Sequence, residues 1–211
     1  MIKSDASLRL LVDAIAARDS EGFSKLLAKA PALAKARFGV TNATRQSANQ
    51  NFIAPAGRYI YRGDTALHFA AASYAVDMIS TLIAHGADVR ARNRLGDEPL
   101  HVAAAGDPGS ESWNPEAQSA AIQALISAGA EPNVANKLGV SPLHKAVRTR
   151  CAHAVRTLLA SGADPAKKNK RGSDAILLAR LNTGRGGSGL PEAKAQQIEI
   201  LRLLKNALAS G

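Results

Sequence analysis

The chain has a single cysteine, few aromatic side chains and no long apolar run. Because Cys151 has no second thiol to pair with, no internal disulfide can form, and we expect no dependence on an oxidising compartment. Aromatic residues make up 4% of the 211 residues, which argues against a core of large rings and favours thin helices packed closely together. No apolar run reaches the roughly 18 residues of a membrane-spanning helix.

The first 20 residues also lack the apolar core of a signal peptide. Charged residues interrupt this segment at Asp5, Arg9, Asp13, Arg18 and Asp19. A signal peptide needs an apolar core of about 7 to 15 residues. We therefore expect a cytoplasmic protein.

Negative charge is scarce as well. The sequence has 27 Lys and Arg against 17 Asp and Glu, a formal net charge of +10. Such a balance favours an acidic protein, nucleic acid or an anionic membrane surface as the partner, and it also serves solubility without any partner. Composition alone does not choose among these alternatives.

What the sequence does contain is a repeated module. Gly-Asp-Thr-Ala-Leu-His-Phe-Ala-Ala (63–71) returns as Gly-Asp-Glu-Pro-Leu-His-Val-Ala-Ala (96–104) and Gly-Val-Ser-Pro-Leu-His-Lys-Ala-Val (139–147). The first residue, which we call the module glycine, recurs after 33, 43 and 33 residues, at Gly63, Gly96, Gly139 and Gly172. A period of about 33 residues with this Thr-Pro-Leu-His-like start resembles the ankyrin repeat.

The resemblance implies an all-α solenoid, in which each repeat has two antiparallel helices and a projecting, β-hairpin-like finger. We expect one domain over residues 1–211 with about five helix pairs, because repeat proteins bury their core between neighbouring modules. Its expected parts are an N-terminal capping repeat (1–36), an inserted finger loop (37–62), repeat 1 (63–95), repeat 2 (96–138) with an inter-helix insert (106–116), repeat 3 (139–171) and a C-terminal capping repeat (172–211) with a glycine-rich insert.

The insert 37–62 holds four of the chain's aromatic residues: Phe38, Phe52, Tyr59 and Tyr61. The segment from Tyr59 to Tyr61 has strand character, and Phe38 with Val40 is a candidate partner for it in an extended hairpin. The aromatic side chains either pin the insert onto the repeats or face a binding partner.

Three histidines occupy the same place in successive modules: His68, His101 and His144. Histidine ligates metals and carries protons near neutral pH. However, equivalent positions in stacked repeats are about 8 to 10 Å apart, whereas zinc needs its ligand atoms at about 2.0 to 2.1 Å. The resemblance implies instead that each ring hydrogen-bonds backbone groups of its own and the neighbouring finger.

Two further arrangements suggest chemistry but are incomplete. Cys151 lies close to His153 without a third orienting group nearby in the sequence. The glycine-rich run 184–189 lacks the Gly-Lys-Ser/Thr ending of a phosphate-binding loop. We therefore expect no catalytic residue, no cofactor and no metal. The enzyme alternative would use the insert 37–62 as an active-site loop.

Basic residues recur in columns along the fingers. A second glycine follows each module, at Gly86, Gly129 and Gly162, and the eighth residue after it is basic: Arg94, Lys137 and Lys170. The sixth position adds two more cations, Arg92 and Lys168. The seventh holds asparagine where the ankyrin pattern usually has aspartate, at Asn93, Asn136 and Asn169, which removes negative charge from the rim. These columns suit an anion-facing groove, although an exposed finger is polar in any case.

In the family, the residue after the histidine faces the concave side, and here this position holds Phe69, Val102 and Lys145. We expect Phe69, Tyr74, Tyr59 and Tyr61 to form an apolar patch at one end of a basic groove, because aromatic residues are usual interface anchors. Tyr74 and Arg150 replace the glycine that is usual in the helix-to-helix turn, so the sequence does not assure the family geometry there.

These features predict a monomeric, non-catalytic scaffold or adaptor that binds an acidic segment of a protein partner, and no membrane, through its concave face and basic fingers. The alternative is nucleic acid or another polyanion on the same rim, although no nucleic-acid-binding motif accompanies the charge. The predicted partner-binding residues are Tyr59, Tyr61, Phe69, Tyr74, Arg90, Arg92, Arg94, Lys137, Lys145, Arg148, Lys168, Lys170 and Arg171.

Overall fold

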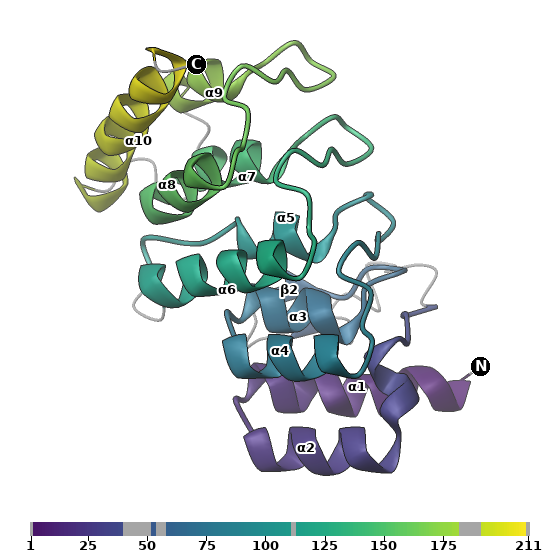
Figure 1. Ribbon diagram of the computed structural model, residues 1–211. Coiled ribbons are helices and arrows are strands. Elements are labelled where there is room, and N and C mark those ends of the chain that lie inside the picture. The colour runs from purple at the N-terminus through teal and green to yellow at the C-terminus, as the bar shows by residue number, and fades with distance from the viewer. Residues whose placement is uncertain (1, 40–51, 54–57, 111–112, 182–190, 210–211) are drawn as a thin grey trace.

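The computed structural model describes residues 2–39, 52–53, 58–110, 113–181 and 191–209. They form two rows of helices, stacked from the amino to the carboxyl end (Figure 1). The inner row consists of α1 (Ile2–Ala16), α3 (Ala66–Ala72), α5 (Pro99–Ala103), α7 (Pro142–Arg148) and α9 (Ala175–Arg180). The outer row consists of α2 (Ser20–Lys29), α4 (Val76–Ala84), α6 (Pro115–Ser127), α8 (Ala152–Ala160) and α10 (Pro191–Ala209), and a 3-10 helix, η1 (Pro31–Ala34), follows α2. The predicted all-α solenoid of helix pairs is confirmed.

The repeated motif starts each inner helix. Thr65, Glu98 and Ser141 cap α3, α5 and α7 with extended backbone angles, and a capping box joins each of them to the histidine three residues later. In α5 and α7 a proline occupies the first turn, where its missing N–H leaves no hydrogen bond unmade. The Leu-His motif therefore fixes where the helix begins.

Small alanines and leucines fill the space between the two rows. On the inner helices Ala70, Ala103 and Ala146 are all 0% exposed, so neighbouring backbones approach closely. On the outer helices the fully buried residues at matching positions are Leu82, Leu125 and Leu158. Each buried leucine contributes about 1.5 to 3 kcal/mol. The scarcity of aromatic residues thus agrees with a core of thin layers.

The fingers project from one edge of the stack (Figure 1). We call residues 86–97 the first finger, 129–140 the second and 162–173 the third. A ladder of backbone hydrogen bonds joins their tips: Arg94 N donates to Arg62 O (2.7 Å), Lys137 N to Leu95 O (3.1 Å) and Lys170 N to Leu138 O (3.0 Å). At Gly139, whose φ is 72°, an added Cβ would lie 2.7 Å from the Lys170 nitrogen. The fingers are therefore stacked as closely as the helices.

The insert forms a short hairpin, but not the predicted one. Strand β1 (Phe52–Ile53) pairs antiparallel with β2 (Arg58–Tyr59), so that Phe52 lies opposite Tyr59. Phe38 instead exchanges backbone hydrogen bonds with Gly63 and Asp64. Phe38 is 3% exposed, and its ring packs edge-on against the Phe69 ring of α3 rather than beside β2. Val40, the other predicted partner, lies outside the described residues.

The helix-to-helix turns keep a left-handed backbone without glycine. The φ angles are 58° at Arg18, 53° at Tyr74 and 62° at Arg150. Each of these side chains reaches the carboxyl end of a neighbouring inner helix: Arg18 Nη2 donates to Ser73 O, Tyr74 Oη to Ala105 O, and the Arg150 guanidinium to Ala179 O and Leu181 O. We call these contacts the turn staples. They satisfy carbonyls that a helix end leaves without intrahelical partners.

Candidate functional site

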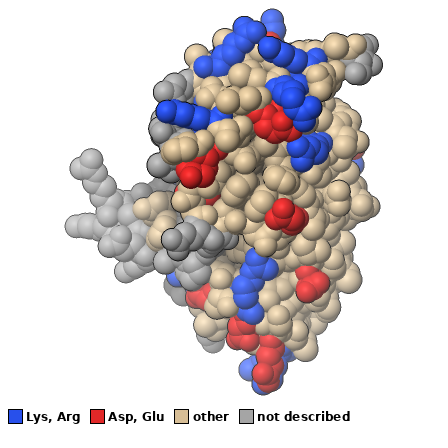
Figure 2. All heavy atoms as spheres, turned by 90° about the vertical axis from the view of Figure 1, so that its left-hand side faces the viewer, with Lys and Arg blue, Asp and Glu red and all other residues tan. Residues whose placement is uncertain are grey.

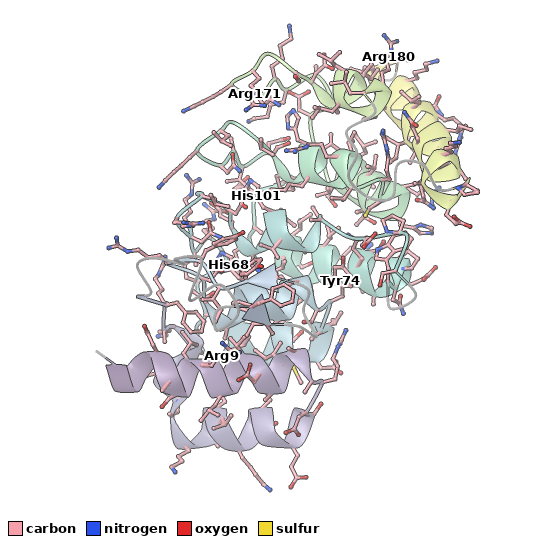
Figure 3. The ribbon with its side chains drawn as sticks, turned by 180° about the vertical axis from the view of Figure 1, so that it is seen from behind. Arg9, His68, Tyr74, His101, Arg171 and Arg180 are labelled. Atoms are coloured by element: carbon pink, nitrogen blue, oxygen red, sulfur yellow. The ribbon has the colours of Figure 1, made fainter. Side chains whose placement is uncertain are left out.

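The module histidines join each repeat to the finger that follows, and Figure 3 labels two of them, His68 and His101. Their Nε2 atoms donate over 3.0 to 3.1 Å to carbonyl oxygens of Asp97, Val140 and Ser173. In each ring Nδ1 accepts the backbone N–H of the capping residue. Nδ1 is therefore unprotonated, and Nε2 carries the hydrogen that it donates. The backbone contacts predicted for His68, His101 and His144 are confirmed.

Asparagine in the fingers serves the fold. Asn93 is 5% exposed, its Oδ1 accepts from Leu95 N and Asp97 N, and its Nδ2 donates to Asp64 Oδ1 of the preceding module over 2.9 Å. Asn136 repeats this contact with Asp97 Oδ1 over 2.8 Å. An aspartate at either position would face a second carboxylate. The interpretation of these asparagines as a means of lowering the rim's negative charge is therefore wrong for Asn93, which is buried.

This contact makes a sharp prediction for Asn93→Asp. The new carboxylate would lose the hydrogen bond to Asp64 and repel it at short range, so the free energy of unfolding should fall by about 2 kcal/mol. Urea unfolding at pH 7.5 measures this loss. The matched control is Asn169→Asp, because the residue in the place of Asp64 is there Val140. Equal losses in the two variants would contradict the assignment.

Phe69 does not face a partner. Its side chain is 0% exposed, with the Phe38 ring 6.2 Å away edge-on and the Arg58 guanidinium 4.7 Å from its ring centre. Arg58 also donates to Asp64 Oδ2 over 2.9 Å. The insert thus covers the inner face of α3. The prediction that Phe69 points outward is wrong, because it is based on the equivalent position in other repeats, which have no such insert.

The remaining aromatic residues of the predicted patch are also held by the chain itself. Tyr74 is half-buried and its hydroxyl donates to Ala105 O over 2.7 Å. The Arg94 guanidinium lies 4.6 Å from the centre of the Tyr61 ring. Tyr59, 40% exposed, packs on Phe52 at 4.9 Å between ring centres. The structure therefore separates Tyr74, at the turn edge (Figure 3), from the tyrosines of the insert.

Three of the four cations on the first two fingers have acceptors within the chain, and the fourth, Arg94, lies over the Tyr61 ring. Arg90 pairs with Glu131 at 2.9 Å and Arg92 with Glu98 at 3.0 Å. Lys137 Nζ donates to Arg94 O over 2.8 Å. We call a cation engaged when its side chain has an acceptor within the chain, and available when it has none among the described residues.

Lys145 is engaged as well. Its ammonium on α7 lies 2.6 Å from Asp97 Oδ2 of the preceding repeat. Burial acts to raise the pKa of the Asp97 carboxyl, but the Lys145 charge and hydrogen bonds from Lys145 and Asn136 outweigh burial and hold that pKa below its ordinary value. Lys145 is thus a brace between repeats, with Arg148 half-buried on the same helix.

Three available cations lie together on the third finger. Lys168, Lys170 and Arg171 are exposed, and within the part of the chain that the structure describes their side chains have no acceptor. Figure 3 places Arg171 at the carboxyl-terminal end of the stack, on the finger side. On the face shown in Figure 2, Lys and Arg also gather mainly towards this end. The cations of the third finger and those that gather on this face therefore lie towards the same end of the molecule.

The residues weighed for chemistry are not arranged for it. Cys151 is 0% exposed, and burial raises the pKa of its thiol to about 11, so the thiolate is disfavoured. In the described ranges no three His, Cys, Asp or Glu residues are placed to hold a metal ion, and no helix there is both long and apolar enough to cross a bilayer. The glycine-rich run 184–189 lies outside the described residues.

Sequence reasoning missed the buried charges near the fingers. Asp64 is 0% exposed and accepts from Arg58, Asn93 and the Tyr61 N–H. Glu98 is 2% exposed, and burial raises the pKa of its carboxyl against the opposing influence of Arg92. The available signal was the Gly-Asp pair that opens two modules, each followed by asparagine one finger later.

Comparison with protein families gives two matches along the chain. A model of ankyrin repeats in three copies matches residues 11–111, and a model of a single ankyrin repeat matches residues 138–170. Together the two matches cover more than half of the chain. A comparison with curated proteins finds no match.

Proposed function

Because the chain belongs to the ankyrin-repeat family, whose repeats generally mediate protein–protein interaction, we propose that it is a non-catalytic binding protein that holds an acidic segment of a protein partner at its third finger. The single observation that supports this choice is the contrast between engaged and available cations. Among the described residues, Lys168, Lys170 and Arg171 have no partner to give up on binding, whereas Arg90 and Arg92 do.

The surface suits binding by a rigid element. The tip of the third finger is tied to the second by the Lys170 N–Leu138 O bond, and its base by the His144 ring. A pre-ordered surface loses little conformational entropy on association. Exposed cations mainly raise the association rate and select the sign of the partner's charge, so we expect binding that weakens with salt.

The test is affinity capture from an extract of the source organism with a variant in which Lys168, Lys170 and Arg171 are all changed to glutamate. We expect the wild-type protein to retain a partner at about 50 mM salt and the variant to lose it, because the contact is electrostatic. The matched control reverses three exposed lysines away from the fingers, Lys29, Lys194 and Lys205, and so makes the same change in net charge.

Two outcomes would contradict the proposal. A partner retained equally by the third-finger variant and the control would place the contact elsewhere. A mobility shift of a duplex DNA probe in a gel would assign the finger to nucleic acid instead. In that case the log of the affinity should fall by about 0.9 per neutralised phosphate for each unit of log salt concentration. Circular dichroism of both variants checks that the helices remain folded.

A further inference from the structure

The residue immediately before each module glycine forms an exposed row along the fingertips: Arg62, Leu95, Leu138 and Arg171. We call it the fingertip row. Leu95 is 39% exposed and Leu138 62% exposed. Two exposed leucines thus stand at equivalent positions on adjacent fingers, between two exposed arginines. Single exposed leucines are common on protein surfaces, but this arrangement repeats with the modules.

The turn itself does not require leucine at this place. What the finger uses is the backbone N–H, which donates to the asparagine Oδ1 two residues earlier: Leu95 to Asn93, Leu138 to Asn136 and Arg171 to Asn169. Arg171 fills the position with the same backbone contact. The turn therefore requires only a backbone N–H at this position, which leucine and arginine supply equally.

The backbone holds the row at a fixed spacing. The ladder bonds from Arg94, Lys137 and Lys170 each start one residue before a row member and end on the preceding row member. An added Cβ at Gly96 would lie 2.9 Å from Lys137 N, so consecutive tips are in contact. Stacked repeats follow one another at about 8 to 10 Å, and row members share that interval.

This interval matches one conformation of a peptide. A polyproline II helix rises about 3.1 Å per residue and has three residues per turn, so every third side chain lies on one face at about 9 Å intervals. In a β-strand, residues three apart point to opposite faces. A polyproline II segment can therefore place four side chains on the four row members.

We propose that the fingertip row binds a polyproline II segment of the partner in which two apolar side chains three residues apart are flanked, three residues further out on each side, by carboxylates. The proposal rests on the proposed function and specifies the partner's chemistry. The apolar side chains pack on Leu95 and Leu138, and the carboxylates pair with Arg62 and Arg171. Neither arginine has an acceptor among the described residues, so the charges at both ends of the row are available.

Two fluorescein-labelled peptides of identical composition test the register. One is Asp-Pro-Pro-Leu-Pro-Pro-Leu-Pro-Pro-Asp, and the other, Asp-Pro-Pro-Leu-Pro-Leu-Pro-Pro-Pro-Asp, brings the leucines one residue closer. Fluorescence anisotropy should show the first peptide binding the whole chain about tenfold more tightly. Leu138→Ala should weaken the first peptide by a similar factor, whereas Leu10→Ala, at a residue 58% exposed on α1, should leave it unchanged.

Each other outcome overturns the proposal. Equal binding of the two peptides, or no effect of Leu138→Ala, excludes the register. Concentration-dependent self-association that Leu138→Ala abolishes would assign the row to a second copy of the chain, and tighter binding of single-stranded DNA than of the first peptide would assign it to nucleic acid. Partner capture that depends on Lys168 and Lys170 while the peptides fail would overturn the fingertip inference and leave the proposed function standing.

Discussion

Replacing Arg150 by alanine is expected to lower the free energy of unfolding by about 4 kcal/mol. The Arg150 side chain is 1% exposed and donates from Nη1 to Ala179 O (2.9 Å) and from Nη2 to Leu181 O (2.7 Å). Hydrogen bonds that involve a charged group are worth about 1.5 to 3 kcal/mol each, and the truncation also removes packing. The negative end of the α9 dipole further stabilises the guanidinium.

Matched variants separate the loss of the Arg150 side-chain contacts from the cost of the positive φ angle at this position. Arg150→Gly should be about 1 kcal/mol more stable than Arg150→Ala, because glycine adopts the positive φ without the steric cost that alanine meets. Arg18→Ala removes the equivalent but exposed staple, and we expect a loss of less than about 1 kcal/mol. Urea unfolding with a constant m-value measures all three. A loss at Arg150 no larger than at Arg18 would refute the assignment.

Acidification is expected to destabilise the fold through the three module histidines. Burial lowers the pKa of His68 and His144 below the ordinary value of 6.5 and that of His101 to about 4. In the folded state a second proton on any of these rings would point at the backbone N–H that Nδ1 now accepts. The neutral ring is therefore part of the native structure.

The sign follows from proton binding. Between pH 6.5 and about 4 the unfolded chain takes up protons that folded His101 refuses, so stability is complete above pH 6.5 and is lost as the pH falls. At 1.36 kcal/mol per pKa unit, His101 alone accounts for about 3 kcal/mol. Glu98 acts in the opposite direction, since its pKa is raised in the fold, but one carboxyl does not offset three imidazoles.

Unfolding free energies measured in urea from pH 8 to pH 4.5 test this expectation. Stability should fall with decreasing pH below 6.5, and His101 should contribute up to one proton per molecule to this slope near pH 5. His101→Gln should be less stable at pH 8, because the ring's two backbone contacts are lost, and its slope should be smaller by up to one proton. A slope that His101→Gln leaves unchanged would show that another group controls the acid response.

The sequence is sufficient for the helix pairs and for the histidine contacts, because these repeat with the modules. A motif that occurs three times specifies the same cap, the same helix start and the same finger each time. The buried Asp64–Asn93 contact was missed because it joins neighbouring modules through residues that a single repeat shows only as polar.

Phe69 shows where repetition misleads. Its position in the motif faces the concave side in other repeats, but here Arg58 and Phe38 come from an insert without an equivalent elsewhere in the chain. The turn staples were missed for a related reason. Tyr74 and Arg150 were noted as departures from glycine, yet only the fold brings Ala105 and Ala179 within reach of them.

The ties between repeats also have a direction. Each module histidine donates from one repeat to a carbonyl of a repeat later in the chain, and the turn staples do the same at the opposite edge. A force that pulls on the two ends of the stack would act on every junction between repeats in series, because each repeat touches only its neighbours. Tension between its ends would extend it by opening one junction at a time, and the fingers and turns of the other repeats would keep their shape.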